Sequence, residues 1–253
     1  MDWQLLALIG IGFTAGFINT LAGGGSLMSL PFLMFLGLPA NVANGTLRIA
    51  ILMQNLVGVS SFKQQKIFNF REGIWYSIPA ALGAIIGASF AISINDEIMK
   101  YIIGTLLIFM FFFMIFKPNV WLKQKSEIIK TKPSIIQIIV LFFIGLYGGF
   151  IQAGVGFFIL AGLVLSAGFD LVKANAIKIF IVLIYTFFAL SVFIFDGLVN
   201  YKFGFILAAG NMVGAFIGSR FAVSWGPKFV RYILLIVLLF NALKIFGVFN
   251  LLF

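Results

Sequence analysis

The sequence predicts an all-α polytopic membrane protein built from two inverted-topology repeats, each with a glycine-broken helix pair and three spanning helices. Composition is the first observation, because the 253 residues are 62% hydrophobic and 9% charged, with a mean hydropathy of +1.17. A soluble domain is nearer half apolar and a quarter charged. The second observation is that apolar runs recur along the whole chain, and the third is that its two halves resemble each other. A water-soluble enzyme is excluded, because so few charges cannot cover a soluble surface.

The apolar runs give the order of the elements. A spanning helix needs about 20 apolar residues, so the chain has room for roughly eight to ten segments. The predicted segments are 3–21, 26–36, 43–62, 72–93, 97–116, 134–153, 157–167, 172–195, 203–222 and 229–249. The runs 26–36 and 157–167 are too short to span, and each follows a glycine-rich break. We expect three parts: a first membrane repeat 1–116, a basic cytoplasmic linker 117–133 and a second membrane repeat 134–253.

The internal repeat is visible at a shift of 131 residues. That shift aligns 69–91 with 200–222, with identity at eight of 23 positions. It also pairs Asn44 with Asn175. The two halves are therefore copies of one unit.

The distribution of Lys and Arg predicts that the two repeats are inverted. Cytoplasmic loops carry an excess of these residues, which places the basic loops 63–71 and 117–132 inside and the acidic loop 94–97 outside. The corresponding loops of the second half show the opposite bias. Both termini are then predicted outside the cell membrane. The net charge of +10 is accounted for by these loops, and no nucleic-acid partner is expected. Inverted repeats with broken helices are typical of secondary transporters that hold substrate near the midplane.

Each glycine-broken pair must return to the side on which it starts, so that each half crosses the membrane an odd number of times. The pair is either two crossings or one re-entrant hairpin. If both pairs are hairpins, they enter from opposite sides and their tips can meet in the middle.

The glycine-rich breaks are the first candidate site. Glycines allow sharp turns with unpaired N–H groups, and the N-terminus of the next helix attracts anions. The residues concerned are Asn19, Gly23, Gly24, Gly25, Ser26, Gln152, Gly154 and Gly156. The alternative is close helix packing by small residues, which is our interpretation of Gly83, Gly87, Gly214 and Gly218.

The helices that follow the breaks carry the second set of candidates. One face of 43–62 and one face of 172–195 each hold a cation several residues inside an apolar run, where cations are rare and usually functional. The candidate residues are Asn44, Arg48, Gln54, Asn55, Asn175, Lys178 and Tyr185. The alternative is that the two long side chains extend to the membrane surface. Two inward cations predict an anionic substrate.

Missing residue types narrow the chemistry further. The chain has no Cys and no His, which removes thiol chemistry and the usual metal ligands and proton carrier. All acids lie at or near segment ends, so we expect no sodium site, metal or cofactor, and no catalysis. If transport is proton-linked, the proton travels on a weakly acidic substrate, or through Glu72 or Asp170.

The same residues carry a resemblance to a known family. The segments AGFINTLAGGGSLMSLPFLMFLGLPANVANGTLR (15–48) and GGFIQAGVGFFILAGLVLSAGFDLVKANAIK (148–178) resemble the paired signatures of the sulfite exporter TauE/SafE family. This family is also called the toluenesulfonate uptake permease family. The resemblance implies a membrane protein that moves sulfite, sulfonates, sulfoacetate or other small organic anions. It also implies that 23–26, 44–48 and 175–178 line the pathway.

The predicted function is a secondary transporter that moves a small anion, sulfite or a short organosulfonate such as sulfoacetate, by alternating access. Its expected partners are the lipid bilayer and the anion. The alternatives are an anion-selective channel, a carrier of a non-sulfur organic anion, and a membrane scaffold without a pathway. The sequence does not reveal whether the protein is a homodimer, because dimer and lipid faces are both apolar.

Overall fold

The computed structural model describes residues 2–67, 70–105 and 133–245, and these residues form only helices and their connections. The helices are α1 (Asp2–Leu21), α2 (Ser26–Phe35), α3 (Ala40–Gln64), α4 (Phe70–Ser93), α6 (Ile135–Phe150), α7 (Val155–Ala167), α8 (Leu171–Phe195) and α9 (Tyr201–Ile245). Residues 96–105 are also helical. The predicted all-α class is thus confirmed for the described part of the chain. The linker residues 117–132 lie outside it.

Five of the described helical segments are long and apolar enough to cross a membrane. They are Trp3–Leu21, Ala40–Gln64, Phe70–Ser93, Leu171–Phe195 and Tyr201–Trp225. Large apolar side chains such as Trp75, Phe90, Ile135 and Phe195 are exposed on the outside of the bundle, where a bilayer can cover them. Polar side chains such as Asn44 and Thr186 are fully buried. This arrangement is that of a multi-pass membrane protein.

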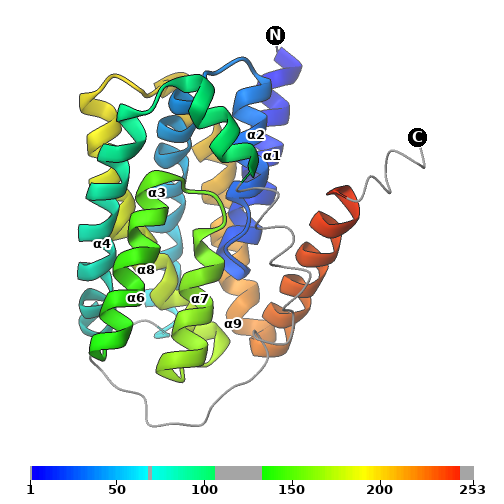
Figure 1. Cartoon of the computed structure of the whole chain (residues 1–253). Helices are drawn as coiled ribbons and strands as arrows, with labels where there is room; N and C mark the ends of the chain where they lie inside the picture. Colours follow the sequence, from blue (N-terminus) through cyan, green and yellow to red (C-terminus); the bar gives the residue numbers. More distant parts are fainter. Residues whose placement is uncertain (1, 68–69, 106–132, 246–253) are drawn as a thin grey trace.

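The two short apolar helices each belong to a helix pair with a break. In Figure 1, α1 descends from the N-terminus and α2 returns to the upper end, whereas α6 ascends from the lower end and α7 returns to it. Glycines with left-handed backbone angles make both breaks, Gly23 at φ 87° and Gly154 at φ 75°. Other residues rarely adopt such angles. Both pairs therefore start and finish at one end of the bundle.

Helix contacts follow the internal repeat. Helix α1 of the first half packs on α9 of the second half, and α6 of the second half packs on α4 of the first. Likewise α3 packs on α9 as α8 packs on α4, while α3 and α8 meet each other at the centre (Figure 1). Glycines allow these close approaches: a Cβ at Gly83 would collide with the carbonyl of Phe142, and a Cβ at Gly214 with that of Phe13. The predicted packing role of these glycines agrees with the contacts.

One predicted boundary is wrong. The sequence predicts separate segments at 203–222 and 229–249, but the structure has one helix of 45 residues, α9. Figure 1 shows α9 as two limbs that meet at an angle at the lower end of the molecule. Gly226 and Pro227 lie between the two predicted segments, and proline inside a helix kinks it without having to end it. The apolar pattern located the span that the structure has at Tyr201–Trp225, and it took a kink in the helix for a loop.

Candidate functional site

A small cavity lies where the two breaks meet α3 and α8. Its lining residues are Asn19, Gly23, Ser26, Ile51, Gln54, Asn55, Gln152, Gly156, Lys178, Val182 and Tyr185. The centre of a water molecule can occupy about 20 Å³ of it, which is room for about one or two waters. Both halves of the chain contribute to the cavity, and seven of its eleven lining residues have polar side chains.

The two breaks touch each other directly at the cavity. A Cβ on Gly23 would lie 2.5 Å from the carbonyl carbon of Gly156, so only glycine fits there. The Ser26 hydroxyl donates a hydrogen bond to the Gln152 carbonyl at 3.3 Å and accepts one from the Gly154 N–H at 3.1 Å. The N-terminal ends of α2 and α7 consequently both face this cavity. Helix N-termini carry a partial positive charge and unpaired N–H groups.

Lys178 holds the C-terminal end of α1. Its Nζ donates to the carbonyls of Asn19 at 2.8 Å and Thr20 at 3.3 Å, and to Asn175 Oδ1 at 2.7 Å. Asn175 Nδ2 in turn donates to the Leu21 carbonyl at 2.9 Å. A cation is favourable here, because the last carbonyls of a helix lack partners and carry a partial negative charge.

Arg48 does the same for α6 with the halves exchanged. Its Nη1 donates to the Gly148 carbonyl at 3.0 Å and to Gln152 Oε1 at 3.2 Å, and its Nη2 donates to the Gly149 carbonyl at 2.5 Å. Asn44 Nδ2 donates to the Phe150 carbonyl at 2.7 Å. Thus each cation comes from one half of the chain and caps the broken helix of the other.

Both cations are buried without a buried acid beside them. Arg48 is 0% exposed and Lys178 is 1% exposed, so neither side chain extends to a membrane surface. No Asp or Glu is buried among the described residues. Burying a charge is costly unless it is paired. The hydrogen-bonded carbonyls offset part of this cost, and the site retains an excess of positive charge.

Polar side chains form a network around the cavity. Gln54 Oε1 accepts hydrogen bonds from Asn19 Nδ2 at 3.3 Å and from Asn211 Nδ2 at 3.2 Å. Asn19 Oδ1 accepts from the Gly25 N–H at 3.0 Å. Gln152 Nε2 donates to the Tyr185 hydroxyl at 2.9 Å, which connects Arg48 to the cavity wall through one side chain.

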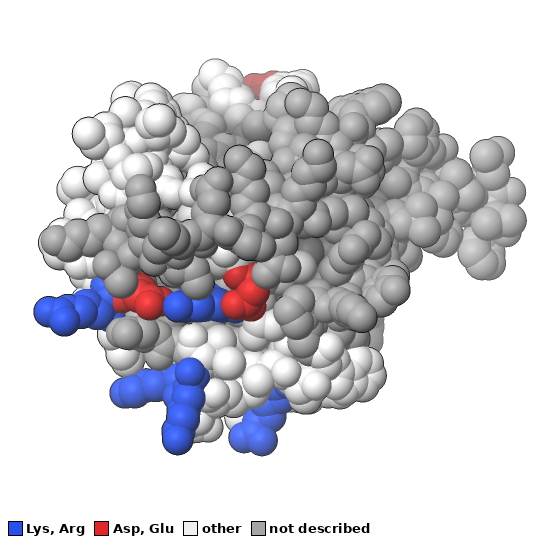
Figure 2. All heavy atoms as spheres, turned by 90° about the horizontal axis from the view of Figure 1, so that it is seen from below, with Lys and Arg blue, Asp and Glu red and all other residues white. Residues whose placement is uncertain are grey.

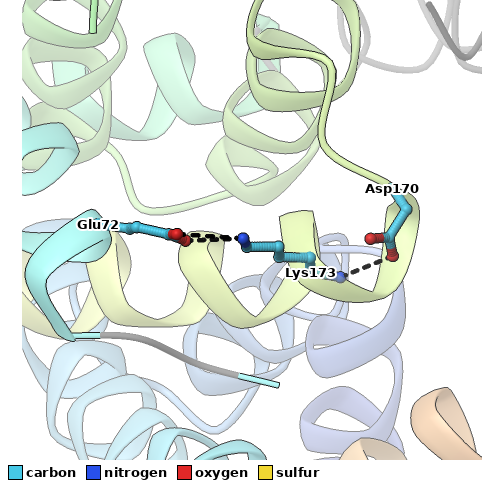
Figure 3. Close-up of polar contacts among 3 residues, drawn as sticks. All are labelled: Glu72, Asp170 and Lys173. Carbon is cyan, nitrogen blue, oxygen red and sulfur yellow. Dashed lines mark hydrogen bonds and ion pairs between the residues drawn. The ribbon is translucent and has the colours of Figure 1, made fainter. Parts of the chain in front are cut away.

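The acids suggested as a proton route lie elsewhere. Glu72 pairs with Lys173 at 2.9 Å, joining α4 to α8 (Figure 3). Asp170 caps α8, accepting from the N–H groups of Val172 and Lys173. Neither acid lines the cavity. Figure 2 views the lower end of the molecule, where acidic side chains lie in a row with Lys and Arg side chains, and further Lys and Arg side chains lie apart from them.

The structure brings most of the predicted site residues together. Nine of them line the cavity: Asn19, Gly23, Ser26, Gln54, Asn55, Gln152, Gly156, Lys178 and Tyr185. The others stand behind it, in the breaks (Gly24, Gly25 and Gly154) or at the capped helix ends (Asn44, Arg48 and Asn175). Sequence reasoning missed the two apolar lining residues, Ile51 and Val182. The repeat contained a signal for both, because the shift of 131 residues pairs Ile51 with Val182.

Comparison with known proteins places the chain among membrane transporters. A family model described as sulfite exporter TauE/SafE matches residues 8–245. The chain is 31% identical over 246 residues to a probable membrane transporter protein, ORF9, of a Sinorhizobium species, covering 97% of this chain and 94% of that one. It is 27% identical over 234 residues to a probable membrane transporter protein of Haemophilus influenzae, covering 92% and 91%. It is 27% identical over 228 residues to the probable membrane transporter protein YfcA of Escherichia coli, covering 90% and 84%. No solved structure gives a significant match.

Proposed function

Because this chain belongs to the sulfite exporter TauE/SafE family, we propose that it is a secondary transporter that moves a small anion across the cell membrane by alternating access. The family and the relatives indicate a membrane transporter rather than an enzyme. The identity of the anion, the alternating-access mechanism and the binding residues are all part of what we propose.

The charge around the cavity is the observation that carries the proposal. Two helix N-termini face the cavity, Lys178 lines it, and Arg48 lies one side chain behind it. No buried acid among the described residues balances these charges. An anion in the cavity would supply the missing negative charge, whereas a cation would add to the excess.

Sulfite or a short organosulfonate such as sulfoacetate is the proposed cargo. A sulfur centre with three oxygens can accept hydrogen bonds from several donors at once, and charge-assisted bonds of this kind are the strong ones. The apolar side chains of Ile51 and Val182 also line the cavity and suit a short carbon chain. Sulfite, with four heavy atoms, and a sulfonate with such a chain both require the cavity to widen beyond its present size, as an alternating-access cycle would allow.

The proposed topology is that of two inverted repeats with re-entrant broken pairs. The exchanged helix contacts, α1 with α9 and α6 with α4, support it. So do the two broken pairs, which start from opposite ends of the bundle in Figure 1. In this topology the lower end, with the basic residues of 63–71, faces the cytoplasm. A proton link through Glu72 or Asp170 finds no support in the cavity lining, so a proton carried on a weakly acidic anion is the simpler proposal.

The proposal is tested by flux of sulfite and sulfoacetate into proteoliposomes, with and without an imposed pH gradient. Wild-type protein is compared with Lys178→Met and Arg48→Met. The control is Lys202→Met, which removes an exposed cation at the start of α9. A carrier is supported by saturable flux that becomes faster when the anion is also present on the opposite side of the membrane. This flux should be lost in Lys178→Met and Arg48→Met and should persist in Lys202→Met. Conductance without saturation would favour the channel instead. Undiminished flux in Lys178→Met and Arg48→Met would refute the assignment of the cations.

A further inference from the structure

Asn55 presents an unused hydrogen-bond donor at the cavity. The side chain is 2% exposed, lines the cavity, and its Nδ2 has no hydrogen-bond partner. Buried polar groups without partners are uncommon in native proteins, and a site for a missing ligand is one explanation for them. Among described side-chain atoms that are buried and unpartnered, Asn55 Nδ2 alone belongs to a cavity-lining residue.

The cation at the cavity is already engaged. Lys178 Nζ has three acceptors, the Asn19 and Thr20 carbonyls and Asn175 Oδ1, and an ammonium group has three donor hydrogens. It therefore contributes charge to the cavity and has no free hydrogen to donate there. Gln152 is engaged through both amide atoms, accepting from Arg48 and donating to Tyr185, and Gln54 Oε1 accepts from Asn19 and Asn211.

We propose that Asn55 is the specificity-determining residue of the anion site, donating its Nδ2 hydrogen bond to an oxygen of the anion. In this arrangement Lys178 attracts the anion through space, and Asn55 with the helix N-termini of α2 and α7 supplies the directional contacts. Arg48 does not line the cavity and is a positioning residue, which acts by orienting Gln152. This inference rests on the proposed function, because it names the donor within the same anion site.

Binding to the purified full-length protein in detergent tests the inference without requiring transport. Sulfoacetate is the probe, since its sulfonate and carboxylate both stay ionised from about pH 5.5 to about pH 8. Its dissociation constant is measured for wild type, Asn55→Leu, Asn55→Asp and Ser29→Ala. Ser29 is the matched control, because its Oγ is also buried and unpartnered but does not line the cavity.

The expected result is a dissociation constant about 10- to 100-fold higher in Asn55→Leu, the loss of one hydrogen bond to a charged group. Ser29→Ala is expected to bind as wild type does. The Asn55→Asp variant carries an extra negative charge at about pH 8 and binds poorly. The variant has nearly the size and shape of the wild-type side chain, so a role in packing alone would leave its affinity close to that of wild type.

Wild-type affinity in Asn55→Leu would overturn the inference and leave the proposed function intact. So would wild-type affinity in Asn55→Asp at about pH 8, because a carboxylate beside the bound anion must repel it. If wild-type protein neither binds nor transports sulfoacetate or sulfite, the proposed function is overturned, and the inference with it. Flux measured on the same preparation separates these two outcomes.

Discussion

Alanine substitutions at four glycines separate two costs in the free energy of unfolding that Gly23 avoids. One is an unfavourable backbone angle, and the other is a collision between the two breaks. Gly23 combines φ 87° with a Cβ position 2.5 Å from Gly156. Gly37 has φ 91° but nothing within 4 Å of its Cβ position, so it isolates the backbone cost. Gly156 has no such backbone angle, but its Cβ would lie 2.5 Å from the Gly23 Cα, so it isolates the collision. Gly162, inside α7 with nothing within 4 Å, carries neither cost.

The magnitudes follow from these two terms. A non-glycine residue in the left-handed region costs about 1–2 kcal/mol, and overpacking costs about 1–3 kcal/mol. We therefore expect the free energy of unfolding to fall by about 1–2 kcal/mol in Gly37→Ala and about 1–3 kcal/mol in Gly156→Ala. Gly23→Ala combines the terms and should lose about 2–5 kcal/mol. Gly162→Ala should gain up to about 1 kcal/mol, since alanine is the better helix former.

The assay is unfolding of the purified full-length protein in one detergent, followed by tryptophan fluorescence as denaturant is added. The order of stability is expected to be Gly162→Ala, wild type, Gly37→Ala and then Gly23→Ala. If Gly23→Ala were no less stable than Gly37→Ala, and Gly156→Ala matched wild type, the breaks would not touch. The site built on their contact would then be wrong.

Two further predictions concern the ends of the bundle. The side chains of Glu72 and Lys173 are 14% and 26% exposed. A double-mutant cycle with Glu72→Gln and Lys173→Met should give a coupling in the free energy of unfolding of about 0.2–1 kcal/mol, as for other solvated ion pairs. A coupling of about 3 kcal/mol or more would show that water does not reach this pair. The chain has no Cys, so Lys66→Cys and Glu97→Cys each carry a single label site. An impermeant maleimide added to intact cells is expected to label only Glu97→Cys, and labelling of Lys66→Cys instead would reverse the proposed orientation.

The sequence predicted the fold well where a local signal decides it. The break at Gly23 and the start of α2 at Ser26 follow from a glycine run between two apolar runs, and no distant contact is needed to place them. The kink in α9 shows the limit, because a loop and a kinked helix both place Gly226 and Pro227 between apolar segments. Whether the chain leaves the helix there depends on packing against neighbouring helices, which the local pattern does not contain.

The sequence predicted most of the residues that the structure brings together at the candidate site, but not what each of them contacts. Arg48 and Lys178 stood out because cations inside apolar runs are rare. Their partners are main-chain carbonyls about 100 or more residues away, Gly148 and Gly149 for Arg48 and Asn19 and Thr20 for Lys178. Every residue has a carbonyl, so no side-chain pattern reveals which of them a cation will cap. Ile51 and Val182 were missed because apolar residues in an apolar helix give no signal except their equivalence in the repeat.

In the proposed carrier, capping a helix end and attracting the anion make opposite demands on the two cations, and the two cations lie differently with respect to the cavity. A helix that ends inside a bilayer leaves carbonyls that water cannot reach, and each unsatisfied group is costly there. Arg48 and Lys178 meet this need for α6 and α1, but a cation whose hydrogens are all given to carbonyls has none for a ligand. Lys178 has two such carbonyls and Asn175 Oδ1 as acceptors and lines the cavity, whereas Arg48 reaches it only through Gln152. An anion attracted by the charge of Lys178 would draw the ammonium group away from the α1 carbonyls and loosen the end of the first break as it binds. Substrate binding and movement of the broken helix would then be one event, which is the coupling that alternating access requires.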